Sequence, residues 1–330
     1  MKAIKFFAIS AMAAAMITSC STDDELSQSN YPSDNIIRVT AGVNNAKTRA
    51  EGAGTEMKKD FSLTIVNKNA PKYTYTDKVF SKTSGDWACS ETLLWQKSDA
   101  LVDIVAFAPA QTGKFNGVYA NGSIQPIAYS VASDQSTEQS TSSDNNDLLY
   151  YYAKDFNPGE SLDKGKLNIQ FNHAFCMIDI VVTLGTEFNK PSIPTTSPIV
   201  KVTLGGTKIA ANVDVTNAAS VVTASETADA TTITTTKGSF DKAANAEANA
   251  ISRFSCIAIP QTVGANTFKV SLMTAGKLYE WTSAEPVVLK SGYRYTLNLS
   301  MGNDVVLLKG GSISATPWTE ITSDKPLETD

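Results

Sequence analysis

The one histidine of the chain, His173, limits the catalytic chemistry that this sequence can perform. A Ser-His-Asp triad would have to use it, and a zinc site with two histidines is excluded. His173 lies between two phenylalanines in the segment 171–175, and a histidine among apolar neighbours is usually a structural hydrogen-bonding residue. The sequence also has no G-x-S-x-G elbow, P-loop or dinucleotide fingerprint. We therefore expect no catalytic residue and no enzymatic activity.

The acidic residues offer two further chemistries, and neither has a specific signal. Glycoside hydrolysis needs a carboxylate pair, but nothing singles out a pair among the 33 Asp and Glu residues. The oxygen-rich segment 144–147 lacks the spacing and the glycine of an EF-hand, so a solvated loop is expected there. We expect no metal and no cofactor. With a net charge of −5 and only four Arg, the chain lacks the basic face that a nucleic-acid partner requires.

The N-terminus reads as an export signal. Lys2 and Lys5 precede an apolar run, residues 6–17, that is too short to span a bilayer, so we predict a signal peptide over 1–19. Small residues then lead into Cys20 in a pattern that resembles a bacterial lipobox, which implies cleavage before Cys20 and its acylation. The alternative is a secretory peptide that merely contains a cysteine. The acidic cluster at 23–25 resembles the surface-export signal of Bacteroidales lipoproteins, or is a plain solvated tether.

Three other cysteines remain after processing: Cys89, Cys176 and Cys256. An odd number in an exported protein leaves at least one thiol without an intramolecular partner. Their scattered positions do not indicate a disulfide framework. We expect buried free thiols.

The body of the chain reads as strands and turns. With 330 residues and 42% apolar composition, it is long enough for two domains with real cores. Segment 36–43 alternates, with Ile37, Val39, Ala41 and Val43 on one face, and 61–66 is a second strand. Turn signals predict hairpins within 117–128, 202–215, 268–281 and 305–313. Apart from a short helix over 241–250, this pattern predicts an all-β protein built from β-sandwiches.

The same pattern suggests where the domains divide. Pro and Gly cluster at 158–166, which predicts an N-terminal β-sandwich over 50–165 and a C-terminal one over 166–330. The strand 167–171 would then open the second domain, and a break at 191–198 is the alternative. Polar stretches at 133–146 and 216–236 are expected to be long surface loops.

The order of these features resembles the fimbrillin family of Bacteroidales, the subunits of type V pili. The resemblance is spread over most of the chain, and each motif alone is weak. It is carried by the segments 47–50, 94–95, 102–109, 147–151, 167–180, 293–299 and 313–318. It implies two transthyretin-like β-sandwiches in tandem and a structural subunit, stalk or tip, of a surface pilus that supports adhesion. The implied partners are other fimbrillin subunits, the outer membrane through the lipid, and a receptor on a host or bacterial surface.

The family also implies a mechanism. A trypsin-like protease would cut between Arg49 and Ala50, releasing the tether, residues 20–49, together with the alternating strand 36–43. The vacated groove would accept a strand from the next subunit, held by backbone hydrogen bonds and alternating side chains. The donor would come from the apolar C-terminal residues Val305, Val306, Leu307, Leu308 and Ile313.

Two other interpretations stay open. The protein could be a pilus anchor that keeps its lipid and is not cleaved. It could instead be a solitary surface lipoprotein that binds glycans through Trp87 or Trp281. That second interpretation predicts tryptophans on a shared exposed face and no cleavage at Arg49.

Overall fold

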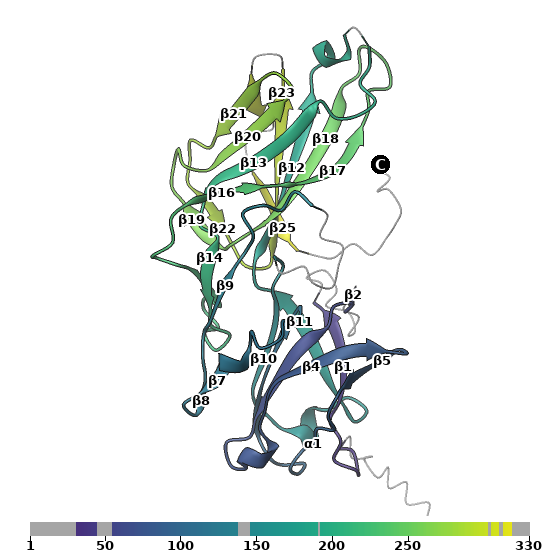
Figure 1. Cartoon of the computed structure of the whole chain (residues 1–330), viewed down its shortest axis with the longest axis vertical. Helices are drawn as coiled ribbons and strands as arrows, with labels where there is room; N and C mark the ends of the chain where they lie inside the picture. The colour runs from purple at the N-terminus through teal and green to yellow at the C-terminus, as the bar shows by residue number, and fades with distance from the viewer. Residues whose placement is uncertain are drawn as a thin grey trace, which may run out of the picture.

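The chain forms two β-rich lobes that follow one another along the long axis of the molecule (Figure 1). The structure is a computed structural model, and it describes residues 31–44, 55–137, 146–190, 192–302, 305–309 and 313–318. Helical segments within these ranges are short: α1 (Pro158–Ser161), η1 (Pro71–Tyr73), η2 (Asn116–Val118) and η3 (Thr186–Asn189). The predicted all-β class is confirmed. No helix in the described ranges is long and apolar enough to cross a membrane.

The first lobe is built on one eight-stranded sheet. In spatial order its strands are β2 (Thr55–Glu56), β1 (Arg38–Val43), β11 (Lys166–His173), β10 (Leu149–Phe156), β6 (Val102–Ala108), β3 (Phe61–Val66), β4 (Tyr75–Thr83) and β5 (Asp86–Cys89). β3 and β6 are buried along their whole length, which indicates that both faces of the sheet are covered there. The sheet curls so that β1 lies beside β5 near its other edge (Figure 1).

The strand that we expected to open the second domain belongs to this first sheet. β11 pairs in parallel with β1 and antiparallel with β10, and its apolar residues Leu167, Ile169 and Phe171 are part of the first core. Conversely, β9 (Ile127–Ser130), from the first half of the chain, pairs with β14 (Ala210–Val213) in the second lobe. The chain therefore crosses between the lobes more than once. A division between residues 165 and 166 stays a prediction.

The second lobe packs several smaller sheets around one core. One sheet contains β17 (Thr236–Asp241), β18 (Ala250–Ala258), β12 (Cys176–Leu184), β23 (Tyr293–Met301), β24 (Val306–Leu308) and β25 (Ser314–Pro317). Another contains β16 (Thr231–Thr234), β13 (Ile199–Thr207), β20 (Lys269–Thr274) and β21 (Leu278–Thr282). The shorter pairings add β15 (Val222–Ala224) beside β14, β19 (Gln261–Val263) with β22 (Val287–Leu289), and β7 (Tyr119–Ala120) with β8 (Ser123–Ile124). β12 alternates buried and half-buried residues, as a strand facing a sandwich core should.

Several local predictions can be compared with these pairings. β3 begins and ends as predicted, and β20 with β21 and β7 with β8 are the predicted hairpins. The predicted hairpin within 202–215 is wrong, because β13 pairs with β16 and β20 while β14 pairs with β9 and β15. β24 and β25 also form no hairpin, since both pair with β23. Segment 242–249 is not helical, and 216–236 contains the strands β15 and β16 rather than only loop.

Candidate strand-exchange groove

β1 lies in the first sheet as a parallel neighbour of β11. The register runs from Arg38 opposite Lys166 to Val43 opposite Phe171. On its other side β2 covers only the last two residues of β1. Its backbone is therefore bonded along its length to one strand and over a short stretch to the other. A β-strand held mainly through one edge can leave without unravelling the rest of the sheet.

The side chains of β1 and its entry alternate as predicted. Ile37, Val39 and Val43 are 6%, 4% and 1% exposed and belong to the first core. Ala41 lies on the same face and is half-buried against that core. Thr40 is exposed, and its hydroxyl donates to the Asn168 side chain on the outer face at 3.3 Å. The alternation follows from the period-2 geometry of a strand with one buried face.

Aromatic rings from distant strands line the groove in which β1 lies. Phe61 stacks on Phe80 with ring centroids 5.4 Å apart, and it contacts Trp87 at 4.8 Å and Phe171 at 5.5 Å. These rings belong to the same core as the inward side chains of β1. Burying three aliphatic side chains stabilises β1 in this core by roughly 5–9 kcal/mol, before the entropy cost of ordering the strand is subtracted. Removing β1 would take its inward side chains out of this core and leave one edge of β11 unpaired.

Both ends of β1 are fastened by backbone hydrogen bonds that sequence inspection did not reveal. The Ile37 N–H donates to the Leu93 carbonyl at 2.9 Å, and the Trp95 N–H donates to the Asn35 carbonyl at 2.8 Å. After the strand, the Asn44 N–H donates to the Phe171 carbonyl at 2.8 Å. If β1 were absent, the Leu93 and Phe171 carbonyls and the Trp95 N–H would lose these partners.

The predicted processing and lipidation residues Cys20, Arg49 and Ala50 lie outside the described residues. The described chain stops at residue 44 and resumes at residue 55, so the predicted cleavage position falls between β1 and β2. Cleavage there would break the chain connection between β1 and the rest of the sheet. The roles of these three residues stay predictions.

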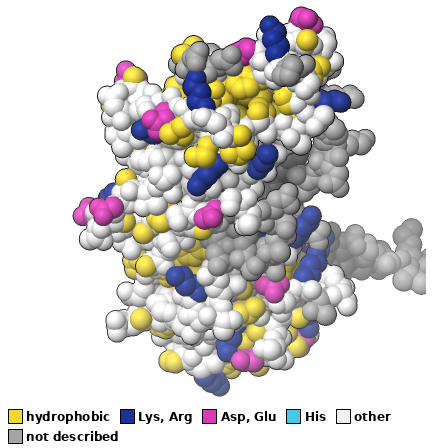
Figure 2. All heavy atoms as spheres, turned by 45° about the horizontal axis from the view of Figure 1, so that its top comes forward, with side chains coloured by type: hydrophobic (Ala, Val, Ile, Leu, Met, Phe, Trp, Pro, Cys, Tyr) yellow, Lys and Arg dark blue, Asp and Glu magenta, His cyan; other side chains and the backbone are white. Residues whose placement is uncertain are grey.

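The candidate donor residues lie in and beside β24 and β25. Val305 and Leu307 are 53% and 61% exposed, while Val306 is buried and Ile313 is half-buried against the second core. Leu308 ends β24, and its side chain is outside the described set. All four residues of β25 are exposed, so backbone pairing with β23 holds that strand. Figure 2 shows hydrophobic side chains gathered over the upper part of the second lobe, with Lys and Arg beside them.

Trp318 anchors the end of this C-terminal segment on His173. The two rings stack with centroids 3.8 Å apart and 10° between their planes. The backbone N–H of Trp318 donates to the Gly292 carbonyl at 2.8 Å. Beneath the indole, His173 Nδ1 lies 2.9 Å from Asp147 Oδ1, and both side chains are buried. Burial alone raises the pKa of Asp147, but the charge and hydrogen bond of His173 outweigh it and hold that pKa below its ordinary value. His173 thus has the predicted hydrogen-bonding role.

The other candidate chemistries can be placed as well. Within the described residues, no group of three or more His, Cys, Asp or Glu side chains could hold a metal ion. Cys176 and Cys256 are buried and free, as expected, whereas Cys89 is free but half-buried. The prediction that Trp87 and Trp281 share an exposed face is wrong. Both are half-buried, and Trp87 contacts Phe61 in the first lobe while Trp281 contacts Phe268 in the second.

These features define an all-β architecture in which an N-terminal strand packs into a core that contains several aromatic rings. The family model described as fimbrillin-like matches residues 48–318, so the chain belongs to the fimbrillin-like family. The match begins after β1 ends. Family membership supports a role as a pilus subunit in adhesion, assembled with other fimbrial subunits at the cell surface.

Solved structures with low sequence identity share the fold. A protein assigned to cell adhesion from Bacteroides ovatus is 17% identical with a TM-score of 0.60, covering 87% of this chain and 98% of that one. One from Bacteroides uniformis is 14% identical with a TM-score of 0.55, covering 87% and 100%. A fimbrial protein from Bacteroides vulgatus is 16% identical with a TM-score of 0.54, covering 86% and 99%. A comparison with curated proteins found no match.

Proposed function

We propose that this chain is a stalk or tip subunit of a surface pilus that assembles by strand addition. It is exported as a lipoprotein through Cys20, and a trypsin-like protease cuts it between Arg49 and Ala50. The cut frees β1, and a strand from the next subunit enters the groove beside β11. The position of β1 carries the proposal, because its buried alternating side chains and one fully paired edge fit a removable strand.

The groove accounts for two properties that such a subunit needs. While β1 is in place, the edge of β11 is paired and the inward side chains of β1 are buried in the first core, which would prevent premature association at this edge. After exchange, an incoming strand with apolar residues at every second position would bury a comparable surface. A joint of that kind opens slowly, since three or four anchors must leave together.

The experiment compares two substitutions that lie two residues apart in the sequence. Arg49→Ala should keep the subunit membrane-bound and absent from sheared pili, whereas Lys47→Ala should assemble like the unaltered protein. Western blotting of the sheared and membrane fractions measures both. If Arg49→Ala assembles normally, processing at this position is not required. If all of the unaltered protein stays membrane-bound, an uncleaved anchor becomes the better account.

A further inference from the structure

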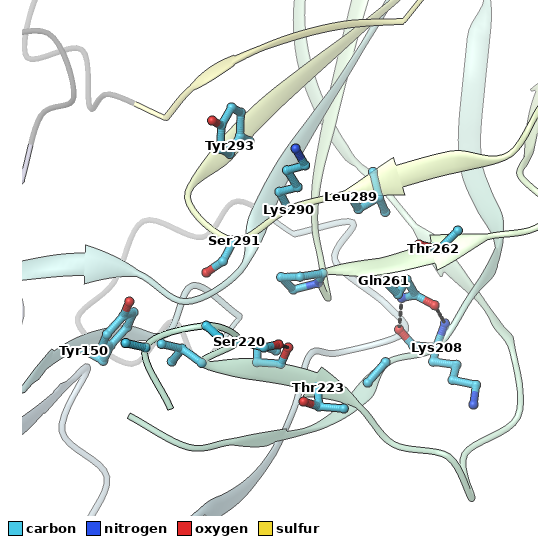
Figure 3. A pocket seen from close by; sticks show the side chains of 16 residues that line it. Tyr150, Lys208, Ser220, Thr223, Gln261, Thr262, Leu289, Lys290, Ser291 and Tyr293 are labelled. Atoms are coloured by element: carbon cyan, nitrogen blue, oxygen red, sulfur yellow. Dashed lines mark hydrogen bonds between the residues drawn. The ribbon is translucent and has the colours of Figure 1, made fainter. Parts of the chain in front are cut away.

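A second concave site lies away from the β1 groove, where β10 of the first lobe meets the second lobe (Figure 3). Its volume is about 760 Å³, within the size range of small-molecule sites. The walls come from β10, the segment around β15, β19 and the β22–β23 connection. Its lining includes no residue of β1, β24 or β25, so it does not depend on strand exchange.

The charge of this wall differs from that of the whole chain. The sequence has five more acidic than basic residues, 33 against 28, yet among the described residues the cavity is lined by Lys208 and Lys290 and by no Asp or Glu. Lys208 is fixed in place, because its Nζ donates to the Ser225 carbonyl at 2.8 Å and the Gln261 amide bonds both its backbone groups at 2.9 and 3.0 Å. Lys290 is exposed, and within the described chain no hydrogen bond or ion pair uses its ammonium group.

Two half-buried tyrosines from different lobes reach the same cavity. Tyr150 comes from β10 and Tyr293 from the start of β23, and neither hydroxyl has a hydrogen-bond partner in the described ranges. Burial raises the pKa of Tyr150, so its phenol stays a hydrogen-bond donor at neutral pH. Tyrosine rings offer flat apolar faces, and the exposed hydroxyls of Thr223 and Thr262 add polar groups along the wall.

We propose that this cavity binds a carboxylate-bearing saccharide. The Lys290 ammonium pairs with the carboxylate, the tyrosine rings pack against the C–H face of the sugar, and the hydroxyls bond its polar groups. An anion is favoured because none of the described residues that line the cavity is acidic, so no such side chain competes for the lysines. Neither Trp87 nor Trp281 lines this cavity, so it is a different site from the glycan site considered from the sequence.

The test uses two sugars that differ only in the carboxylate, titrated calorimetrically into the full chain. Glucuronate should bind, and glucose should bind at least about tenfold more weakly, as expected for loss of one charge-assisted contact. Lys290→Gln should weaken glucuronate binding by a similar factor, while its backbone N–H keeps its bond to the Tyr295 hydroxyl. Lys242→Gln, an exposed lysine outside the cavity, is the matched control and should change nothing.

Three results would overturn the proposal. The first is no binding of either glucuronate or N-acetylneuraminate at millimolar concentration. The second is equal affinity for glucose and glucuronate. The third is Lys290→Gln binding glucuronate as well as Lys242→Gln does. None of these results bears on pilus assembly, so the two proposals fail or stand separately.

Discussion

A disulfide between positions 40 and 168 should lock β1 into its groove and block assembly. Thr40 and Asn168 are register partners on the neighbouring parallel strands β1 and β11. Their side chains meet on the outer face, with Thr40 Oγ1 3.3 Å from Asn168 Oδ1, so cysteines there are close enough to bond. The perturbation is therefore the pair Thr40→Cys with Asn168→Cys, which leaves the buried face of β1 unchanged.

The expected magnitude follows from the structure. The two positions are 128 residues apart, so the bond closes a long loop and stabilises the uncut chain by about 5 kcal/mol in the chain-entropy model. After proteolysis, the tethered β1 stays at an effective concentration on the order of 1 mM. A donor strand of similar affinity supplied at about 1 µM is therefore roughly a thousandfold less concentrated than the tethered β1 with which it competes for the groove. Assembly should fall to background and return on reduction.

The assay follows polymer formation by light scattering and electron microscopy after cleavage between Arg49 and Ala50. Cys89 is changed to Ser beforehand, because its half-exposed thiol would otherwise compete. Thr40→Ser with Asn168→Ser is the control for loss of the native side chains. If the oxidised, fully cut protein assembles as fast as its reduced form, β1 does not need to leave and the reasoning is refuted.

Three further predictions concern the second lobe and the junction. Asp147 has a lowered pKa in the folded state, so its stabilising contribution is present above the ordinary value of 3.8 and is lost as the pH falls below it. Urea unfolding between pH 6 and pH 2 should show a steeper loss for the unaltered protein than for Asp147→Asn, and parallel curves would contradict this. Burial raises the pKa of both Cys176 and Cys256, the latter to about 12, so in a chain starting at residue 21 a thiol reagent should modify only Cys89 before unfolding. Rapid native labelling of all three thiols would rule out that burial. Trp318→Ala should lower the free energy of unfolding by about 3–5 kcal/mol and speed hydrogen exchange across β25, because it removes the buried side chain that anchors an otherwise exposed strand. Unchanged exchange in β25 would show that its pairing with β23 suffices.

Local sequence signals predicted the elements that depend on neighbours in the chain. The alternation at 36–43 predicted which side chains of β1 are buried, since one strand face must be apolar. The hairpin of β20 and β21 was predicted because its strands are joined by a short turn that contains Gly276.

Pairings between distant segments could not be predicted in this way. Gly205 and Gly206 read as a hairpin turn, but Gly206 has a φ of +86° within β13, and a Cβ there would lie 2.1 Å from the Thr267 carbonyl oxygen. Gly206 therefore lets the Thr267 backbone pack closely against β13 at a register shift, and it does not form a turn. The pairing of β11 with β1 could not be predicted, because the alternation of β11 shows that one face is buried and says nothing about its partners.

The sequence predicted the strand that fills the candidate groove, but it did not predict the residues that line the groove. Its lining combines Phe61, Trp87 and Phe171, which the fold brings together from three strands. The stack of Trp318 on His173 joins the end of β11, in the first sheet, to the residue that follows β25, and neither neighbourhood carries a local signal for it. Such contacts depend on tertiary packing, which periodicity does not encode.

The most direct test of the central claim is the N-terminus of the assembled protein. Mass spectrometry would compare protein sheared from the cell surface with the membrane-bound fraction. The strand-exchange account predicts that the sheared form begins at Ala50, so that it lacks β1. Sheared pili whose subunits all keep an acylated Cys20 would contradict it.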